Sequence, residues 1–321
     1  MTYEFESLSY SEALKMADEG ETWLVDNIIG SSTTLIYGEA KSGKSVLVSA
    51  LIKSLATGAD SLNKPVPQDR AFSVAVCWTD DRGAQEYSER IRTVMPDEET
   101  PNVRFYHVPI MRTPEMWRAL YERVMSGGHN FVVIDNLAQT LNGSVNDDAV
   151  VRQFFDGTRM FVRAGIPVVV VAHSSDKAGL NGYKPETPMG SAYITQAVRW
   201  RVFARRSRKG NITLKFMGNH AAPYEMTLHH GAGARFDMID VKSPEALKAN
   251  AEGAARNRDK ARLDENLGVA RWVVENCQGM TQRQAAEKLA AELSCPPEAA
   301  RTKIRRAPVE KTAGDGWVIS E

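Results

Sequence analysis

The sequence predicts an α/β protein with a mostly parallel, twisted sheet, followed by a small C-terminal winged helix-turn-helix unit. Three observations predict this class. A glycine-rich segment, residues 38–45, lies between a β-branched strand pattern and an apolar helical pattern. Short apolar runs then alternate with helical patterns up to about residue 200, which is typical of a parallel sheet. Residues 264–321 contain three helical patterns and a short terminal strand.

Residues 38–45 read Gly-Glu-Ala-Lys-Ser-Gly-Lys-Ser and fit the phosphate-binding pattern G-x-x-x-x-G-K-[ST]. The pattern joins a predicted strand (33–37) to a predicted helix (46–55), so backbone N–H groups at a helix N-terminus can bind an anion. Lys44 is expected to reach the β- and γ-phosphates, and the Ser45 hydroxyl to bind Mg²⁺. The sequence therefore predicts ATP and Mg²⁺ as cofactors, bound by Gly38, Glu39, Ala40, Lys41, Ser42, Gly43, Lys44 and Ser45.

Further strands and helices follow in order. Residues 1–30 form a lead-in with a short helix. Between residues 73 and 172 the sequence predicts strands at 73–78, 103–108, 131–135 and 167–172, with helices at 114–125 and 150–164. The last two strands are almost continuously apolar, as expected for strands buried on both faces. After residue 200, the runs 202–204, 212–216 and 224–228 predict successive antiparallel strands, which complete a domain spanning residues 1–240.

Polar side chains follow three of the predicted strands. Asp135 ends an apolar strand in the Walker B pattern and is expected to hold Mg²⁺ opposite Ser45. Asp80 or Asp81, at the end of a strand beside the phosphate-loop strand, could polarise an attacking water, although Asp-Asp also suits a turn or helix cap. His173 could sense the γ-phosphate from the sheet edge; a capping or core histidine is the alternative.

Composition restricts the class of protein. Forty basic and forty acidic residues give a net charge of zero, so no global field favours nucleic acid, although a local basic face remains open. The three cysteines have no metal-ligand spacing and do not suggest a disulfide framework. The N-terminus is acidic without an apolar signal core, and the longest apolar run, 167–172, is far too short to span a bilayer. We therefore expect a cytoplasmic protein without a membrane partner.

The basic residues lie in two regions. One spans residues 199–209 and, with Lys177 and Lys184 in a loop nearby, could contact nucleic-acid phosphates or stabilise charge across a subunit boundary; a solvated strand face is the alternative. The other is the tail, residues 264–321, which follows a linker at 241–263 that is partly helical at most. Thr281 is its expected N-cap, and Arg301, Lys303 and Arg305 cluster on its candidate recognition helix, which suits duplex DNA or, alternatively, a protein partner.

Residues 20–230 resemble the RecA-like hexameric ATPases, and within them the RepA-type replicative helicases of plasmids and phages. The resemblance depends on the order of several short motifs: Trp23-Leu24-Val25-Asp26, Gly38–Ser45, Trp78-Thr79-Asp80-Asp81, Val132–Asn136, Ala172–Lys177, Gly190-Ser191, Arg199-Trp200 and Gly218–Pro223.

This resemblance implies a RecA-like core and a homo-oligomeric ring, a hexamer, with ATP at the subunit interfaces and single-stranded DNA at the channel loops after Asp135 and His173. It assigns Lys44 and Ser45 to phosphate and Mg²⁺, Asp135 to the metal, His173 to the γ-phosphate sensor, Arg199 to an arginine finger for the neighbouring subunit and Arg90 to a further phosphate contact. Two positions depart from the family: Asp80 replaces the usual glutamate, and Met217 replaces a lysine for which Lys215 could substitute.

Three functions remain open on the sequence alone. The leading hypothesis is an ATP-driven DNA motor, most of all a hexameric replicative helicase. The first alternative is an ATP-switched recombination or annealing mediator, or a helicase loader, without unwinding activity. The second is a DNA-binding regulator in which the phosphate-loop domain only oligomerises.

Overall fold

A computed structural model describes residues 7–19, 22–95, 102–175, 186–312 and 316–320. The chain divides into two compact units, Met1–Pro244 and Glu245–Glu321. In the described parts of both units, no helix combines the length and the apolar character that crossing a membrane requires.

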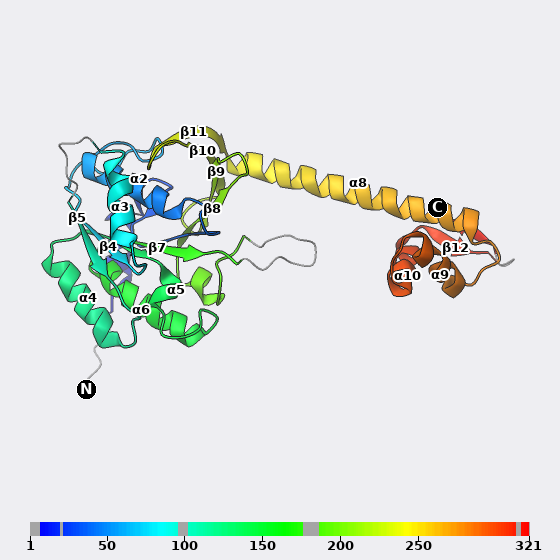
Figure 1. Ribbon diagram of the computed structural model, residues 1–321, viewed down its shortest axis with the longest axis horizontal. Helices are drawn as coiled ribbons and strands as arrows, with labels where there is room; N and C mark the ends of the chain where they lie inside the picture. The colour runs from blue at the N-terminus through cyan, green and yellow to red at the C-terminus, as the bar shows by residue number, and fades with distance from the viewer. Residues whose placement is uncertain (1–6, 20–21, 96–101, 176–185, 313–315, 321) are drawn as a thin grey trace. The chain divides into compact units, whose positions relative to one another are not determined.

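The first unit is built on a nine-stranded sheet with the order β11-β10-β9-β8-β3-β7-β6-β4-β5 (Figure 1). Neighbours from β8 to β5 in this order pair in parallel, whereas β8, β9, β10 and β11 are joined antiparallel. The strands are β3 (Thr33–Gly38), β4 (Val74–Trp78), β5 (Val103–His107), β6 (Phe131–Asp135), β7 (Val168–His173), β8 (Trp200–Arg206), β9 (Ile212–Gly218), β10 (Tyr224–His230) and β11 (Phe236–Lys242). The predicted mostly parallel α/β sheet is confirmed.

The strand order corrects one expectation about Asp80. The strand that precedes it, β4, was expected beside the phosphate-loop strand β3. Two strands, β7 and β6, separate β4 from β3 instead. The reason is that β6 and β7 are apolar on both sides, so they occupy the centre of the sheet, where both faces are covered.

Helices cover both faces of this sheet. Figure 1 shows α2 (Lys44–Thr57) and α3 (Gly83–Arg92) on one face, and α4 (Pro114–Ser126) and α6 (Asp148–Arg163) on the other. Alternate residues of each central strand enter the two cores: Val133 packs with the α2 face and Val132 with the α6 face. The remaining elements of this unit are α1 (Tyr10–Glu19), β1 (Trp23–Val25), β2 (Ile29–Gly30), α5 (Leu137–Thr140) and α7 (Tyr193–Gln196).

The second unit contains α8 (Pro244–Asn276), α9 (Gln282–Glu292), α10 (Pro297–Arg306) and the antiparallel pair β12 (Val309–Lys311) and β13 (Trp317–Ile319). Residues 244–263, expected to be a linker that is helical only in part, are helical throughout and continuous with the helix predicted at 267–275. They are rich in alanine, arginine, lysine and glutamate, which favour helix, and have no proline after Pro244.

The core of the second unit lies at the C-terminal end of α8. Val273 of α8, Leu289 of α9 and Ile304 of α10 are buried in one cluster with Trp317 of β13. The expected N-cap is confirmed, because Thr281 and Gln284 form a reciprocal capping box at the start of α9. Three helices and a two-stranded sheet are the elements that a winged helix requires; most of the turn expected at 314–316 lies outside the described residues.

Candidate nucleotide-binding site

The phosphate loop runs from the end of β3 to the start of α2, and two positions in it require glycine. Gly43 has a φ of 96°, in the left-handed region that side chains disfavour. A Cβ on Gly38 would lie 2.1 Å from the carbonyl oxygen of Ala204 in the adjacent strand β8. The loop backbone therefore adopts this path only with glycine at both positions.

Polar groups converge on this loop. The buried Lys44 Nζ donates hydrogen bonds to the carbonyl oxygens of Gly38 (3.1 Å) and Glu39 (2.7 Å). Ser42 Oγ is buried and has no hydrogen-bond partner among the residues that the structure describes. Buried hydroxyls are usually hydrogen-bonded, so a phosphate oxygen at the loop would supply the acceptor that Ser42 lacks. The loop thus fits the phosphates of a nucleotide.

Ser45 and Asp135 meet beside the loop. Ser45 Oγ donates to Asp135 Oδ2 over 2.8 Å, and the Tyr87 hydroxyl of α3 donates to the same oxygen over 2.7 Å. Burial raises the pKa of Asp135, while the hydrogen bonds from Tyr87 and Ser45 lower it in part. A hydroxyl beside a buried carboxylate is a donor set that suits Mg²⁺, which would take its other ligands from phosphate and water.

The ends of β4 and β6 are tied together at this point. Thr79 donates from its backbone N (3.0 Å) and from Oγ1 (3.2 Å) to the carbonyl oxygen of Asp135, and Asn136 N donates to Thr79 Oγ1 over 3.1 Å. The peptide bond between Asp135 and Asn136 is cis. The Asn136 side chain then caps α5 through Gln139 N. These bonds fix the backbone that carries the Walker B carboxylate.

Asp80 and Asp81 follow β4 and are exposed. The negative charge of Asp80 contributes to the raised pKa of Asp135, after the larger effect of burial, so the two carboxylates are close enough to interact. Arg90 lies one turn beyond Tyr87 on α3 and donates to Glu86 over 2.5 Å. Its charge acts on the Tyr87 hydroxyl, so Arg90 is near the site but paired within its own helix.

The structure brings His173 to the phosphate loop. His173 is half-buried at the end of β7 and pairs in register with Gly38, while Ser174 N donates to the Gly38 carbonyl over 3.0 Å. A side chain at this position is adjacent to the loop that would hold the γ-phosphate.

The structure does not bring Arg199 to this site. Arg199 is exposed and precedes Trp200, which pairs with Thr34 at the start of β3. The span from Arg199 to Ala204, the partner of Gly38, corresponds to about 17 Å of extended strand, more than an arginine side chain can cover. Arg199 therefore lies at the opposite edge of the sheet from the phosphate loop of its own chain.

The other predicted cations differ in their surroundings. Lys215 Nζ forms an ion pair with both carboxylate oxygens of Glu186, at 2.7 and 2.6 Å, rather than extending towards solvent. Lys177 and Lys184 lie outside the described residues. Nothing in this geometry assigns Lys215 to the role of the lysine that Met217 replaces.

In the second unit, Arg305 is exposed on α10, whereas Arg301 lies 4.0 Å from Glu298 on the same helix. Lys303 is paired with Glu265 of α8, and this pairing lowers the pKa of Glu265. Of these three, Arg305 presents its charge most openly.

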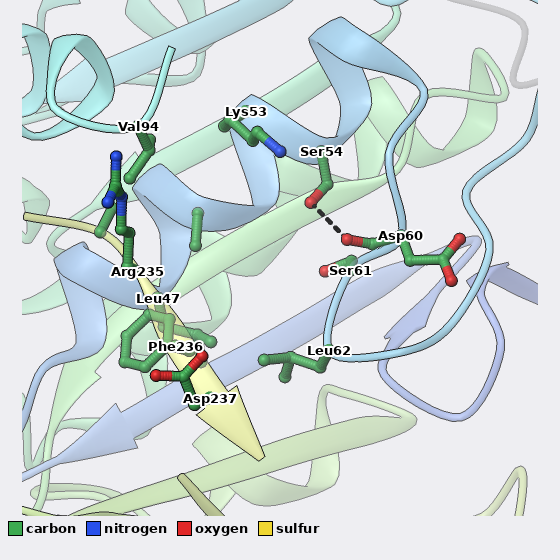
Figure 2. Close-up of a pocket in the computed structure, with 12 residues that line it drawn as sticks. Leu47, Lys53, Ser54, Asp60, Ser61, Leu62, Val94, Arg235, Phe236 and Asp237 are labelled. Carbon is green, nitrogen blue, oxygen red and sulfur yellow. Dashed lines mark hydrogen bonds between the residues drawn. The ribbon is translucent and has the colours of Figure 1, made fainter. Parts of the chain in front are cut away.

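A separate pocket of about 290 Å³ lies along the flank of α2 (Figure 2). Leu47 and Lys53 of α2, Val94 beyond α3 and Phe236 of β11 line it, and Ser54 Oγ donates to the Asp60 carbonyl at its rim. None of the predicted nucleotide-binding residues lines this pocket. The phosphate loop, an open surface formed by backbone, is thus distinct from it.

Two contributors to the site escaped the sequence analysis: helix α3, which carries Tyr87, and the hydrogen bonds of Thr79. The signal for α3 was the spacing of Tyr87, Ile91 and Met95, one apolar residue per turn, all of which are buried. No sequence pattern indicates that the Tyr87 hydroxyl reaches Asp135, because that contact depends on the sheet order.

Comparisons with known proteins agree with this site. The AAA domain profile matches residues 2–179, which include the phosphate loop, Asp80, Asp135 and His173. Among solved structures, the ATPase domain of a phage helicase superposes with a TM-score of 0.52 at 13% identity, over 73% of this chain and 100% of that one, and thus shares the RecA-like fold. No curated protein matches the chain by sequence. With more than half of its length matched and the phosphate loop and Walker B carboxylate in contact, the chain belongs to the AAA-domain family of P-loop ATPases.

Proposed function

We propose that this P-loop ATPase is an ATP-driven DNA motor, specifically a hexameric replicative helicase that hydrolyses ATP at subunit interfaces. The supporting observation is the division of the expected parts between two sheet edges. Lys44, Ser45 and Asp135 gather at one edge, with His173 beside them, while Arg199 is exposed at the other edge. A finger that cannot reach its own site suits an arrangement in which a neighbouring subunit completes it.

In this proposal Asp80 or Asp81 orients the attacking water and Arg90 assists at the phosphates. Single-stranded DNA contacts the loops after Asp135 and His173, including Lys177 and Lys184. Residues 264–321 act as a winged helix that binds duplex DNA through Arg301, Lys303 and Arg305. The resemblance to RepA-type helicases and the RecA-like fold support this assignment.

The test is ATP hydrolysis by the wild type and by Lys44→Ala, with and without single-stranded DNA, with the particle mass measured in the same buffers. Turnover that DNA stimulates, by a species of ring size, is expected for the wild type and should be absent in Lys44→Ala. An unwinding assay on a forked duplex then follows. Turnover that ignores DNA, from a monomer, contradicts the motor.

The second candidate is an ATP-switched mediator or helicase loader that does not unwind DNA. The short side chain of Asp80 and the engagement of Lys215 by Glu186 favour it, because both reduce the groups available for rapid hydrolysis. It predicts tight ATP binding with slow turnover, and DNA binding that depends on ATP without strand separation.

A further inference from the structure

Helix α3 places one tyrosine against the Walker B carboxylate. Tyr87 and Ile91 form the buried face of α3, with exposed fractions of 2% and 4%, and pack into the core that α2 shares. The Tyr87 ring is thereby held on its apolar sides, and its hydroxyl is left at the end of β6, where it donates to Asp135 Oδ2 over 2.7 Å.

The two oxygens of Asp135 have different surroundings. Oδ2 accepts both from Tyr87 and from Ser45 Oγ, at 2.7 and 2.8 Å. Oδ1 receives no hydrogen bond from any residue in the described part of the chain. Two donors on one oxygen define the rotation of the carboxylate plane, and they leave the other oxygen available to an incoming ligand.

The backbone of Asp135 is fixed by a separate set of bonds, those from Thr79 to the Asp135 carbonyl. Thr79 acts on the main chain at the strand end, whereas Tyr87 acts on the carboxylate. Loss of the Tyr87 hydroxyl therefore changes the orientation of the side chain without removing the support of the strand end.

We propose that Tyr87 is a positioning residue for the metal ion: its hydroxyl holds Asp135 so that Oδ1 faces Mg²⁺ or a water bound to it. The proposal rests on the assignment of ATP and Mg²⁺ to this loop. Ser45 can bind the metal through its oxygen while its proton stays on Oδ2, so it cannot also fix the carboxylate when it moves towards the ion. Groups that orient metal ligands in this way commonly change metal affinity by about 10- to 100-fold when removed.

The variant is Tyr87→Phe, which keeps the buried ring and removes only the hydroxyl. Mn²⁺ serves as the probe, and its affinity is measured by electron paramagnetic resonance with a non-hydrolysable ATP analogue bound. We expect the affinity for Mn²⁺ to fall about 10-fold. Binding of the same analogue without metal should stay within about twofold of wild type, because Tyr87 bonds to Asp135 and not to the loop.

Tyr224→Phe is the matched control. Its hydroxyl is also partly buried and donates to a protein oxygen, the carbonyl of Asn27, away from the phosphate loop. Thermal unfolding of both variants shows how far each loss affects the fold, and the Mg²⁺ concentration for half-maximal ATP hydrolysis gives a second readout. It should rise in Tyr87→Phe while kcat at saturating Mg²⁺ changes little, and it should not move in Tyr224→Phe.

Unchanged Mn²⁺ affinity in Tyr87→Phe, or an equal loss in Tyr224→Phe, overturns the role of Tyr87. A parallel loss of metal-free analogue binding does so too, since the hydroxyl would then act on the loop or the fold. If the wild type itself binds the analogue without any dependence on metal, the assignment of the site fails and this inference fails with it.

Discussion

The position of Arg199 leads to a test that depends on two copies of the chain. Arg199 is exposed at the amino edge of the sheet, about 17 Å of strand away from the level of Gly38. If it acts as an arginine finger, it acts on the phosphate loop of a neighbour. Arg199→Ala should then lower kcat by about 10³-fold or more, the usual range for such fingers, and leave ATP binding by the same chain nearly intact.

Mixing defines the geometry more strictly. Lys44→Ala has a defective phosphate loop but an intact Arg199, and Arg199→Ala has the reverse. In a ring with head-to-tail contacts formed from equal amounts of both, one interface in four combines an intact loop with an intact finger, so the mixture should recover about a quarter of wild-type turnover.

The assay is steady-state ATP hydrolysis after the two inactive variants are unfolded, mixed and reassembled together, with each variant alone treated identically. Arg163→Ala is the control, since Arg163 is an exposed arginine at the end of α6 and has no assigned role. Wild-type turnover in Arg199→Ala, or a mixture as inactive as its components, would refute the reasoning from strand polarity.

Three further predictions concern stability. Gly157→Ala places a Cβ 2.1 Å from the Trp117 ring and should destabilise the first unit by about 1–3 kcal/mol in urea unfolding. Gly253→Ala in α8 meets nothing within 4 Å and should instead stabilise that helix by about 0.5–1 kcal/mol, seen as a higher midpoint in circular dichroism. Burial lowers the pKa of His129, so the folded state binds its proton less tightly than the unfolded chain; stability should therefore fall as the pH drops below about 6.5, and a set of urea midpoints should show a weaker dependence for His129→Gln.

The phosphate loop and the central strands were predictable because their signals are local. Gly38 and Gly43 are required by backbone geometry within a few residues, and β6 and β7 are apolar on every position that two covered faces demand. Such patterns carry their explanation in the sequence itself.

The order of the strands was not predictable in the same way. β4 was expected beside β3 because Asp80 seemed to need proximity to the phosphate loop, whereas β6 and β7 lie between them. Pairing between strands far apart in the chain depends on which surfaces the helices cover, and no single run encodes it. The contact between Tyr87 and Asp135 escaped for the same reason, since it joins α3 to a strand 48 residues away.

The extent of α8 shows a different limit. Residues 244–263 have few large apolar side chains, and that composition favoured a linker over a packed element. Helix formation needs no apolar face when alanine, arginine, lysine and glutamate dominate, and α8 is polar around most of this stretch. Hydrophobic patterning therefore marked the part of α8 that packs, from Val269 to Val273, and missed the part that does not.

Strand polarity links the fold to the proposed function. In a parallel sheet every carboxyl end lies at one edge, so the ends of β3, β6 and β7 bring Lys44, Asp135 and His173 together without any long-range adjustment. β8 runs parallel to β3 as well, and its first residues must therefore lie at the opposite edge. A finger placed before β8 can act only on another chain, and hydrolysis then reports the contact between subunits. That dependence is what a ring motor needs to couple ATP to movement, and it is lost if Arg199 proves dispensable.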